Sequence, residues 1–132
     1  MKHEDLMYSK DHLWVYKGKE QAYIGLSAYA SKELGRVVYT DLGISQRVVK
    51  SGETMGTVES VKTVSDLICP FDCEIVDVNV DISAGALESH PEELSGWLYL
   101  VRTKPGADWR EGLMTAPEYE KYTGGGNAAD KT

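Results

Sequence analysis

The order of apolar and polar residues along the chain predicts a series of short β-strands. Runs rich in Val, Ile, Thr and Tyr are separated by glycine-containing turns, and several of them alternate apolar and polar positions, as strands with one buried face do. The predicted strands cover residues 13–17, 22–26, 36–42, 53–60, 63–70, 74–82 and 97–103. Many short strands between glycines indicate a sandwich or a flattened barrel.

Capping signals predict two short helices. Ser27 can cap a helix over residues 28–34, and Gly35 can end that helix in a left-handed conformation. The sequence Thr-Ala-Pro-Glu at 115–118 has the spacing of a capping box, with proline in the first turn, and predicts a helix that continues to Tyr122.

Length and composition predict one folded domain. A chain of 132 residues with 42% apolar side chains can build a single core. We assign residues 1–122 to this domain and expect the glycine-rich, polar segment 123–132 to be a disordered tail. No stretch approaches the roughly 18 apolar residues of a membrane span, and the N-terminal residues lack the apolar core of a signal peptide.

The net charge argues against one class of function, and the cysteine content indicates the redox compartment. The net charge of −7 argues against nucleic-acid binding, which needs a clustered basic surface. Two cysteines make no disulfide framework, so we expect a reducing, cytoplasmic location. The three histidines are scattered, which argues against a metal site, and no catalytic motif stands out.

One lysine lies at an unusual position in the strand pattern. Two β-rich runs meet at Val61-Lys62 with no glycine or proline between them. A tight hairpin at this point would place Lys62 at its tip, with the amine in water. The simplest alternative is a lysine that protects an edge strand from aggregation.

The residues around this lysine resemble a known family. Glu59-Ser60-Val61-Lys62, followed by Ser-Asp-Leu at 65–67, resembles the lipoyl attachment site of glycine cleavage H proteins. The resemblance extends from Tyr8 to Tyr122, through the segments 8–14, 24–35, 91–97 and 116–122. It implies a mainly β, lipoyl-domain-like flattened barrel (a barrel-sandwich hybrid) of two antiparallel sheets, with a few short helices that include one at the C-terminus.

The resemblance also implies a cofactor and a set of partners. Lys62 would carry lipoate as N6-lipoyllysine, on an arm of about 14 Å, and the chain would be a non-catalytic carrier. Glu59, Ser60, Val61 and Asp66 would belong to the attachment site. Glu59 and Asp66 would mark the domain for the modifying enzyme or guide the arm, although ordinary solvated strand charge is the alternative. The implied partners are a lipoate ligase or lipoyl transferase, and dihydrolipoamide dehydrogenase. A biotin carrier is disfavoured because such carriers usually show Met-Lys-Met.

The chain departs from the family at a position that bears on cargo. The family's His-Glu-Trp is His12-Leu13-Trp14 here. In the family, this glutamate holds the cationic methylamine of the loaded arm in a protective cleft. A leucine cannot make that charge-assisted hydrogen bond.

Further departures accompany it, among them Gly43 in place of a usual proline. Arg36 replaces a usual acidic residue, Cys73 replaces a glycine, and Glu88 replaces an asparagine. The candidate arm cleft that the resemblance implies comprises His12, Leu13, Arg36 and Glu88.

Together these departures favour a different cargo. They favour a lipoate-binding paralogue that serves a heterodisulfide-reductase-like sulfur-oxidising complex, whose sulfur cargo carries no ammonium group. The alternative is a true glycine cleavage H protein, which carries methylamine between glycine decarboxylase and aminomethyltransferase.

A separate candidate is the cysteine pair. Cys69 and Cys73 flank a predicted turn that could bring their sulfurs together as a thiol redox module. The alternative is that both are small apolar residues packed at the turn.

Overall fold

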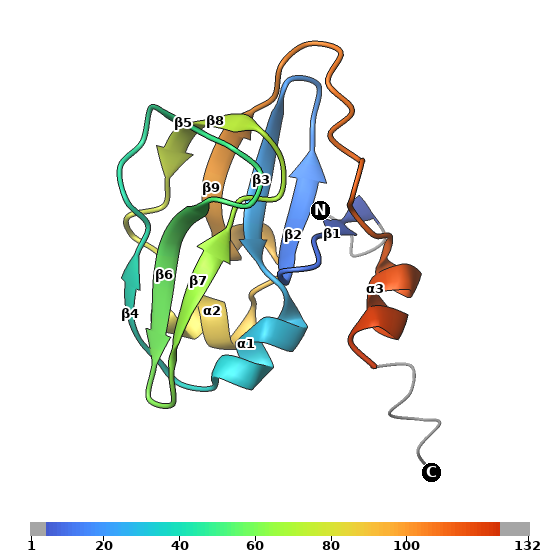
Figure 1. The fold of residues 1–132 in the computed structure, drawn as a ribbon. Coiled ribbons are helices and arrows are strands. Elements are labelled where there is room, and N and C mark those ends of the chain that lie inside the picture. The colour runs from blue at the N-terminus through green and yellow to red at the C-terminus, as the bar shows by residue number, and fades with distance from the viewer. Residues whose placement is uncertain (1–4, 125–132) are drawn as a thin grey trace.

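The chain folds into two antiparallel sheets that enclose a core (Figure 1). The computed structural model describes residues 5–124. The larger sheet has the strand order β1-β2-β3-β9-β8-β5, and the smaller has the order β4-β6-β7. The strands are β1 (Met7–Tyr8), β2 (Leu13–Lys17), β3 (Gln21–Leu26), β4 (Val37–Asp41), β5 (Arg47–Val49), β6 (Thr54–Ser60), β7 (Val64–Ile68), β8 (Cys73–Val78) and β9 (Trp97–Arg102).

The helices are short and lie at the margins of the sheets. They are α1 (Ala28–Leu34), α2 (Ala84–Ser89), the 3-10 turn η2 (Leu94–Gly96) and α3 (Ala116–Tyr122). The predicted mainly β fold of two antiparallel sheets with a C-terminal helix is confirmed. Within residues 5–124, no helix is long and apolar enough to cross a membrane.

The capping signals located both predicted helices correctly. The Ser27 hydroxyl accepts a hydrogen bond from the Ala30 N–H at the start of α1, and Gly35 ends that helix with a φ of 75°. The side chains of Thr115 and Glu118 form the reciprocal capping box of α3. Of the predicted tail, residues 123 and 124 follow α3, and residues 125–132 lie outside the described part of the chain.

All seven predicted strands are present, but the sequence pattern missed four elements, β1, β5, α2 and η2. β1 and β5 have two and three residues, too few for an alternation to show. α2 is six residues long and includes Gly85, which has low helix propensity. The predicted strand 74–82 is too long: β8 ends at Val78, because the chain then turns, with the Ile82 N–H donating to the Asn79 carbonyl.

Two apolar clusters hold the fold together. The main core lies between the sheets and includes Val58 from the smaller sheet and Ile24 from the larger. The second cluster lies on the outer face of the larger sheet and comprises Leu6, Tyr8, Trp14 and Tyr119. It fixes β1 and α3 against that face. The α1 and α2 helices lie at the end of the molecule where the β6–β7 hairpin turns (Figure 1).

Candidate functional site: the lysine hairpin

Lys62 lies at the tip of the β6–β7 hairpin, and the Ser60 side chain holds that tip in shape. The buried Ser60 hydroxyl oxygen accepts hydrogen bonds from the N–H groups of Lys62, at 3.1 Å, and Thr63, at 3.2 Å. The Ser60 N–H donates to the Thr63 carbonyl at 2.8 Å. The turn therefore needs no glycine, since one serine satisfies the backbone donors that the tight bend leaves without strand partners.

The side chain of Lys62 extends beside the C-terminal end of α1. A Cβ atom at Gly35 would lie 3.4 Å from Lys62 Cε and 3.6 Å from Lys62 Nζ. Lys62 is exposed, and within residues 5–124 its ammonium group makes no ion pair or hydrogen bond. The amine is thus accessible while its stem lies along the surface of the body.

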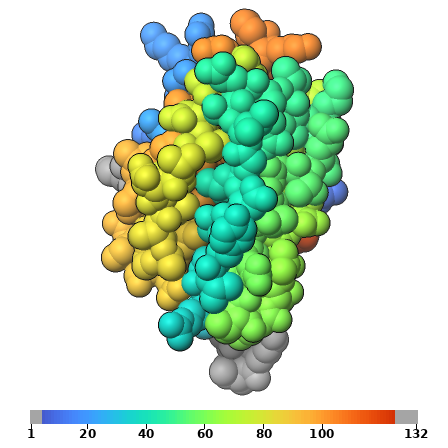
Figure 2. Space-filling view, turned by 90° about the vertical axis from the view of Figure 1, so that its left-hand side faces the viewer, coloured from blue at the N-terminus to red at the C-terminus, as the bar shows by residue number. Residues whose placement is uncertain are grey.

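Arg36 and Glu88 lie near the hairpin and form hydrogen bonds with backbone groups around it. The Arg36 carbonyl accepts a hydrogen bond from the Val61 N–H at 3.0 Å, which joins the hairpin tip to the segment before β4. The Glu88 carboxylate accepts one from the Val37 N–H at 2.9 Å, which joins α2 to the start of β4. Figure 2 shows the β4 segment between the hairpin and the α2 region on this side of the molecule.

Glu59 and Asp66 lie on the outer face of the smaller sheet. Glu59 on β6 pairs with Tyr39 on β4 and with Val64 on β7. Asp66 pairs with Thr57, which lies two positions before Glu59 on β6. Positions two apart in a strand share a face. Tyr39 and Val64 are 61% and 59% exposed, and both acids are exposed. This acidic face, defined by Tyr39, Glu59, Val64 and Asp66, therefore combines carboxylates with uncovered apolar side chains beside the lysine tip.

His12 lies at the opposite end of α1 from Lys62, among aromatic rings. Its ring centroid lies 5.1 Å from that of Tyr29 and 6.0 Å from that of Tyr122, and its Nδ1 is 2.7 Å from the Tyr119 hydroxyl. Burial lowers the pKa of His12 below its usual value, although nearby Asp11 and Glu33 act in the other direction. We call His12, Tyr29 and Tyr122 the aromatic cluster.

Leu13 is a core residue. It is 1% exposed, pairs with Leu26 and packs in the main cluster between the sheets. The four residues of the predicted cleft therefore divide into three environments: Arg36 and Glu88 beside the hairpin, His12 at the far end of α1, and Leu13 in the core.

Comparison with known proteins identifies the family. A family model described as Glycine cleavage H-protein matches residues 6–125. The chain belongs to the glycine cleavage H-protein family. It is 38% identical over 119 residues to the glycine cleavage system H protein 1 of Caldanaerobacter subterraneus subsp. tengcongensis, which covers 90% of this chain and 94% of that protein. It is 38% identical over 122 residues to the H protein of Bacillus subtilis, with 91% and 94% covered.

A solved structure gives the same result. The crystal structure of a glycine cleavage system H protein from Mycobacterium marinum matches with a TM-score of 0.79 and 35% identity, over 92% of this chain and 98% of that one. Proteins of this family are lipoate-bearing carriers. The chain is therefore a lipoyl carrier whose cofactor is lipoate, attached covalently to a lysine.

The surroundings of Lys62 fit such a group. Amide formation needs an accessible amine, which the exposed Lys62 has, and the stem of Lys62 lies at the surface beside Gly35. The sequence pattern identified Gly35 as the end of a helix, but it did not show that Lys62 lies beside this glycine. It missed Tyr29 and Tyr119 as well, because no local signal connects those rings to His12.

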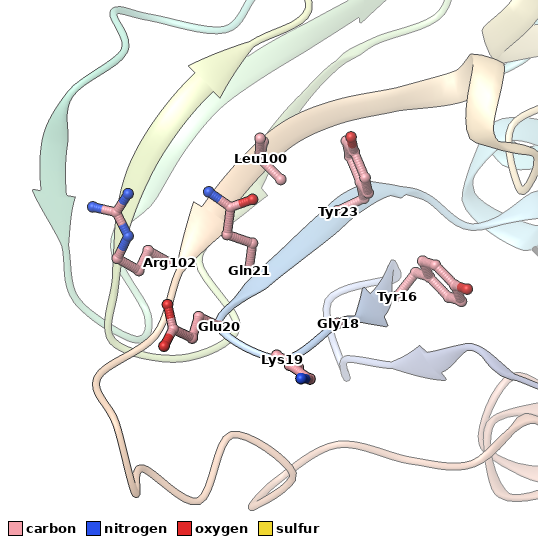
Figure 3. A pocket seen from close by; sticks show the side chains of 8 residues that line it. All are labelled: Tyr16, Gly18, Lys19, Glu20, Gln21, Tyr23, Leu100 and Arg102. Atoms are coloured by element: carbon pink, nitrogen blue, oxygen red, sulfur yellow. The ribbon is translucent and has the colours of Figure 1, made fainter.

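A prominent hollow in the surface lies away from the lysine. It has a volume of about 530 Å³ and is lined by Tyr16, Gly18, Lys19, Glu20, Gln21, Tyr23, Leu100 and Arg102 (Figure 3). The β2–β3 hairpin that supplies most of these residues lies at the opposite end of the sheets from the Lys62 hairpin (Figure 1). An arm of about 14 Å on Lys62 would not reach it.

The described residues 5–124 form no cluster of metal ligands. Residues 5–124 contain no group of three or more His, Cys, Asp and Glu side chains that could hold a metal ion. The two cysteines are both buried, and their Sγ atoms are 3.7 Å apart.

Proposed function

We propose that Lys62 carries the lipoyl group and that the chain acts as a carrier without catalytic activity of its own. The observation that supports this most directly is an exposed amine at the tip of a hairpin that Ser60 braces. The lipoyl group supplies a dithiolane that can be reduced, loaded and reoxidised. The protein supplies a rigid base for it, and the tether raises the effective concentration of the dithiolane at each partner. We also propose a cytoplasmic location, since two cysteines make no disulfide framework.

We propose the acidic face as the surface that the modifying ligase or lipoyl transferase and the later partners recognise. Glu59 and Asp66 supply the charge, while Tyr39 and Val64 supply apolar area. Amide formation removes the positive charge of Lys62 and brings the net charge from −7 to about −8. Partners with basic surfaces would then be attracted to the carrier, which raises association rates.

The α1 helix offers a path along which the arm can rest. Its seven residues span about 10 Å, and the arm spans about 14 Å. An arm that starts at Lys62 and passes Gly35 would therefore reach the aromatic cluster. Arg36 and Glu88 contribute by holding the backbone around the hairpin. The Arg36 backbone carbonyl accepts a hydrogen bond from the Val61 N–H, and the Glu88 carboxylate accepts one from the Val37 N–H.

We propose methylamine as the cargo, with glycine decarboxylase, aminomethyltransferase and dihydrolipoamide dehydrogenase as partners. The relatives described above are named for the glycine cleavage system. The rings of Tyr29 and Tyr122 could hold an ammonium group by cation–π attraction, and the Glu33 charge acts on the same region. These side chains would take over the task that Leu13 cannot perform.

Sulfur carried for a heterodisulfide-reductase-like complex is the second candidate. The observation that favours it is Leu13, an apolar core side chain at the position where the family has its glutamate. Sulfur bound to the dithiol carries no ammonium group, so it would not need the glutamate that Leu13 replaces.

The attachment site is tested by intact mass after incubation with lipoate, ATP and a lipoate ligase. We expect one lipoyl increment in the wild type and in Lys50→Arg, a control at another exposed lysine, and none in Lys62→Arg. A lipoyl increment that persists in Lys62→Arg would disprove the assignment.

The cargo is tested on the lipoylated protein. Glycine decarboxylase with glycine should load methylamine onto the arm at a rate comparable to that of a glycine cleavage H protein, and Tyr29→Leu should lower the rate several-fold. If loading fails while incubation with a sulfur donor produces a stable persulfide adduct, the second candidate replaces the first.

A further inference from the structure

Cys69 and Cys73 form a buried dithiol at one end of the sandwich. Cys69 follows β7 and Cys73 begins β8, so the two residues close a turn of three residues. Their side chains point toward each other, with the Sγ atoms 3.7 Å apart, and the Cys69 thiol also donates to the Phe71 carbonyl at 3.0 Å. A disulfide bond is about 2.05 Å long, so a shift of less than 2 Å would bring the sulfurs into bonding distance.

The turn between the cysteines is connected to the loop before β6. The Gly52 N–H donates to the Cys69 carbonyl, and the Cys69 N–H donates to the Glu53 carbonyl. The Asp72 carboxylate accepts a hydrogen bond from the Ser51 N–H. A covalent link between the two sulfurs would therefore fix not only the turn but also the loop that contacts it.

Solvent approaches the pair through a hollow beside Cys73. This hollow has a volume of about 290 Å³, and its lining includes Cys73, Lys50, Arg102 and Lys104. Cys73 itself is 6% exposed. A small oxidant can approach the sulfurs here, whereas a bulky protein disulfide cannot.

We propose that this dithiol is a modification site, which a peroxide converts reversibly to an intramolecular disulfide. One thiolate attacks the peroxide, the O–O bond breaks, and a sulfenic acid and one water (or alcohol) result. The second thiol then attacks the sulfenic sulfur, the S–S bond forms, and a second water leaves. Overall, two thiols lose two electrons and two protons while one peroxide is reduced. A dithiol reductant reverses the reaction by two thiol–disulfide exchanges.

The reaction does not depend on the lysine arm. Cys69 lies seven positions after Lys62, and β7 connects the two regions, so they are about 20 Å apart. An arm of about 14 Å cannot bring its dithiolane to the cysteines of the same chain. The dithiol thus senses oxidants separately from the state of the carrier arm.

The test uses full-length Lys62→Arg protein, so that lipoyl thiols do not enter the count. The protein is treated with hydrogen peroxide, denatured, alkylated with iodoacetamide and weighed. We expect two alkylated cysteines before oxidation, none after it and two again after dithiothreitol. The melting temperature of the oxidised form should rise by roughly 5 °C. Two alkylated cysteines after peroxide, irreversible addition of oxygen, or a link between chains would each overturn the proposal.

A single-cysteine variant makes the mechanism testable. Cys73→Ser and Cys69→Ser each leave one thiol without a partner for a disulfide, so peroxide should produce a sulfenic acid that dimedone traps in each variant. Absence of a dimedone adduct in both variants would disprove the sulfenic acid step. A failure of lipoylation at Lys62 would leave all of these results unchanged.

Discussion

Lys62 lies against Gly35, and the glycine has no side chain to obstruct it. The Cβ of any other residue would be 3.4 Å from Lys62 Cε, and the backbone at this position has a φ of 75°. Glycine therefore ends α1 with a positive φ at the point where the stem of Lys62 lies beside the helix.

Gly35→Ala should lower the stability of the protein without slowing lipoylation. A positive φ costs an alanine about 1–2 kcal/mol, whereas the added methyl group would lie 3.4 Å from Lys62 Cε, an ordinary van der Waals contact. Gly52→Ala is the matched control, since Gly52 has a φ of 90° and a methyl group added there would meet nothing within 4 Å. We expect a loss of stability in urea unfolding for both variants and wild-type rates of lipoylation in both. Slower lipoylation of Gly35→Ala alone would contradict this prediction.

Tyr119→Phe should destabilise the protein by about 1–3 kcal/mol. The Tyr119 hydroxyl lies 2.7 Å from both His12 Nδ1 and Ser27 Oγ, so its loss removes the partner of the part-buried His12 nitrogen and one of the two partners of the buried Ser27 hydroxyl. Tyr122→Phe is the control: its hydroxyl donates to the Lys10 carbonyl at an exposed site, and its loss should cost less than about 1 kcal/mol. Chemical unfolding followed by tryptophan fluorescence measures both. A larger loss in Tyr122→Phe would contradict the assigned role of the Tyr119 hydroxyl.

Stability should fall as the pH decreases below about 6.5, in part through His12. Burial lowers the pKa of His12 in the folded state, whereas the unfolded chain keeps the usual value of 6.5. The unfolded state therefore binds more protons as the pH falls through 6.5, which favours unfolding. NMR titration should give a His12 midpoint below 6.5. His12→Asn, which tolerates the φ of 75° at this position, should show a weaker decrease in stability between pH 7.5 and 5.5. A midpoint at or above 6.5 would contradict this prediction.

Gly25→Ala should strongly impair folding. A Cβ at Gly25 would lie 2.4 Å from the ring of Trp14, whose Nε1 donates to the Pro91 carbonyl. Overpacking of this kind costs about 1–3 kcal/mol or more. Gly85→Ala in α2 is the control, because a methyl group there has its nearest neighbour at 4.0 Å, and it should be neutral or stabilising. Comparison of melting temperatures tests the pair; similar values would show that Trp14 can move aside.

Local sequence signals were sufficient wherever a feature depends on neighbours along the chain. The hairpin tip at Lys62 follows from two adjoining strand runs, and the starts of α1 and α3 follow from capping residues that lie within one turn of the helix. The acidic residues beside the lysine were also found, since pairing across a hairpin places them at fixed positions.

Tertiary structure decided the rest, because side chains far apart in the sequence meet only after the sheets pack. By itself, the sequence determined the strand-rich fold, the capped helices and an exposed lysine between two strands. It could not show that Leu13 is buried in the core. Nor could it show that His12 contacts Tyr119, which lies 107 positions later, in α3. It gave two cysteines near a turn, but their separation of 3.7 Å depends on how β7 and β8 enter different sheets. Alternation and capping are set by backbone geometry within a few residues, whereas burial and distance between side chains are set by the packing of the whole domain.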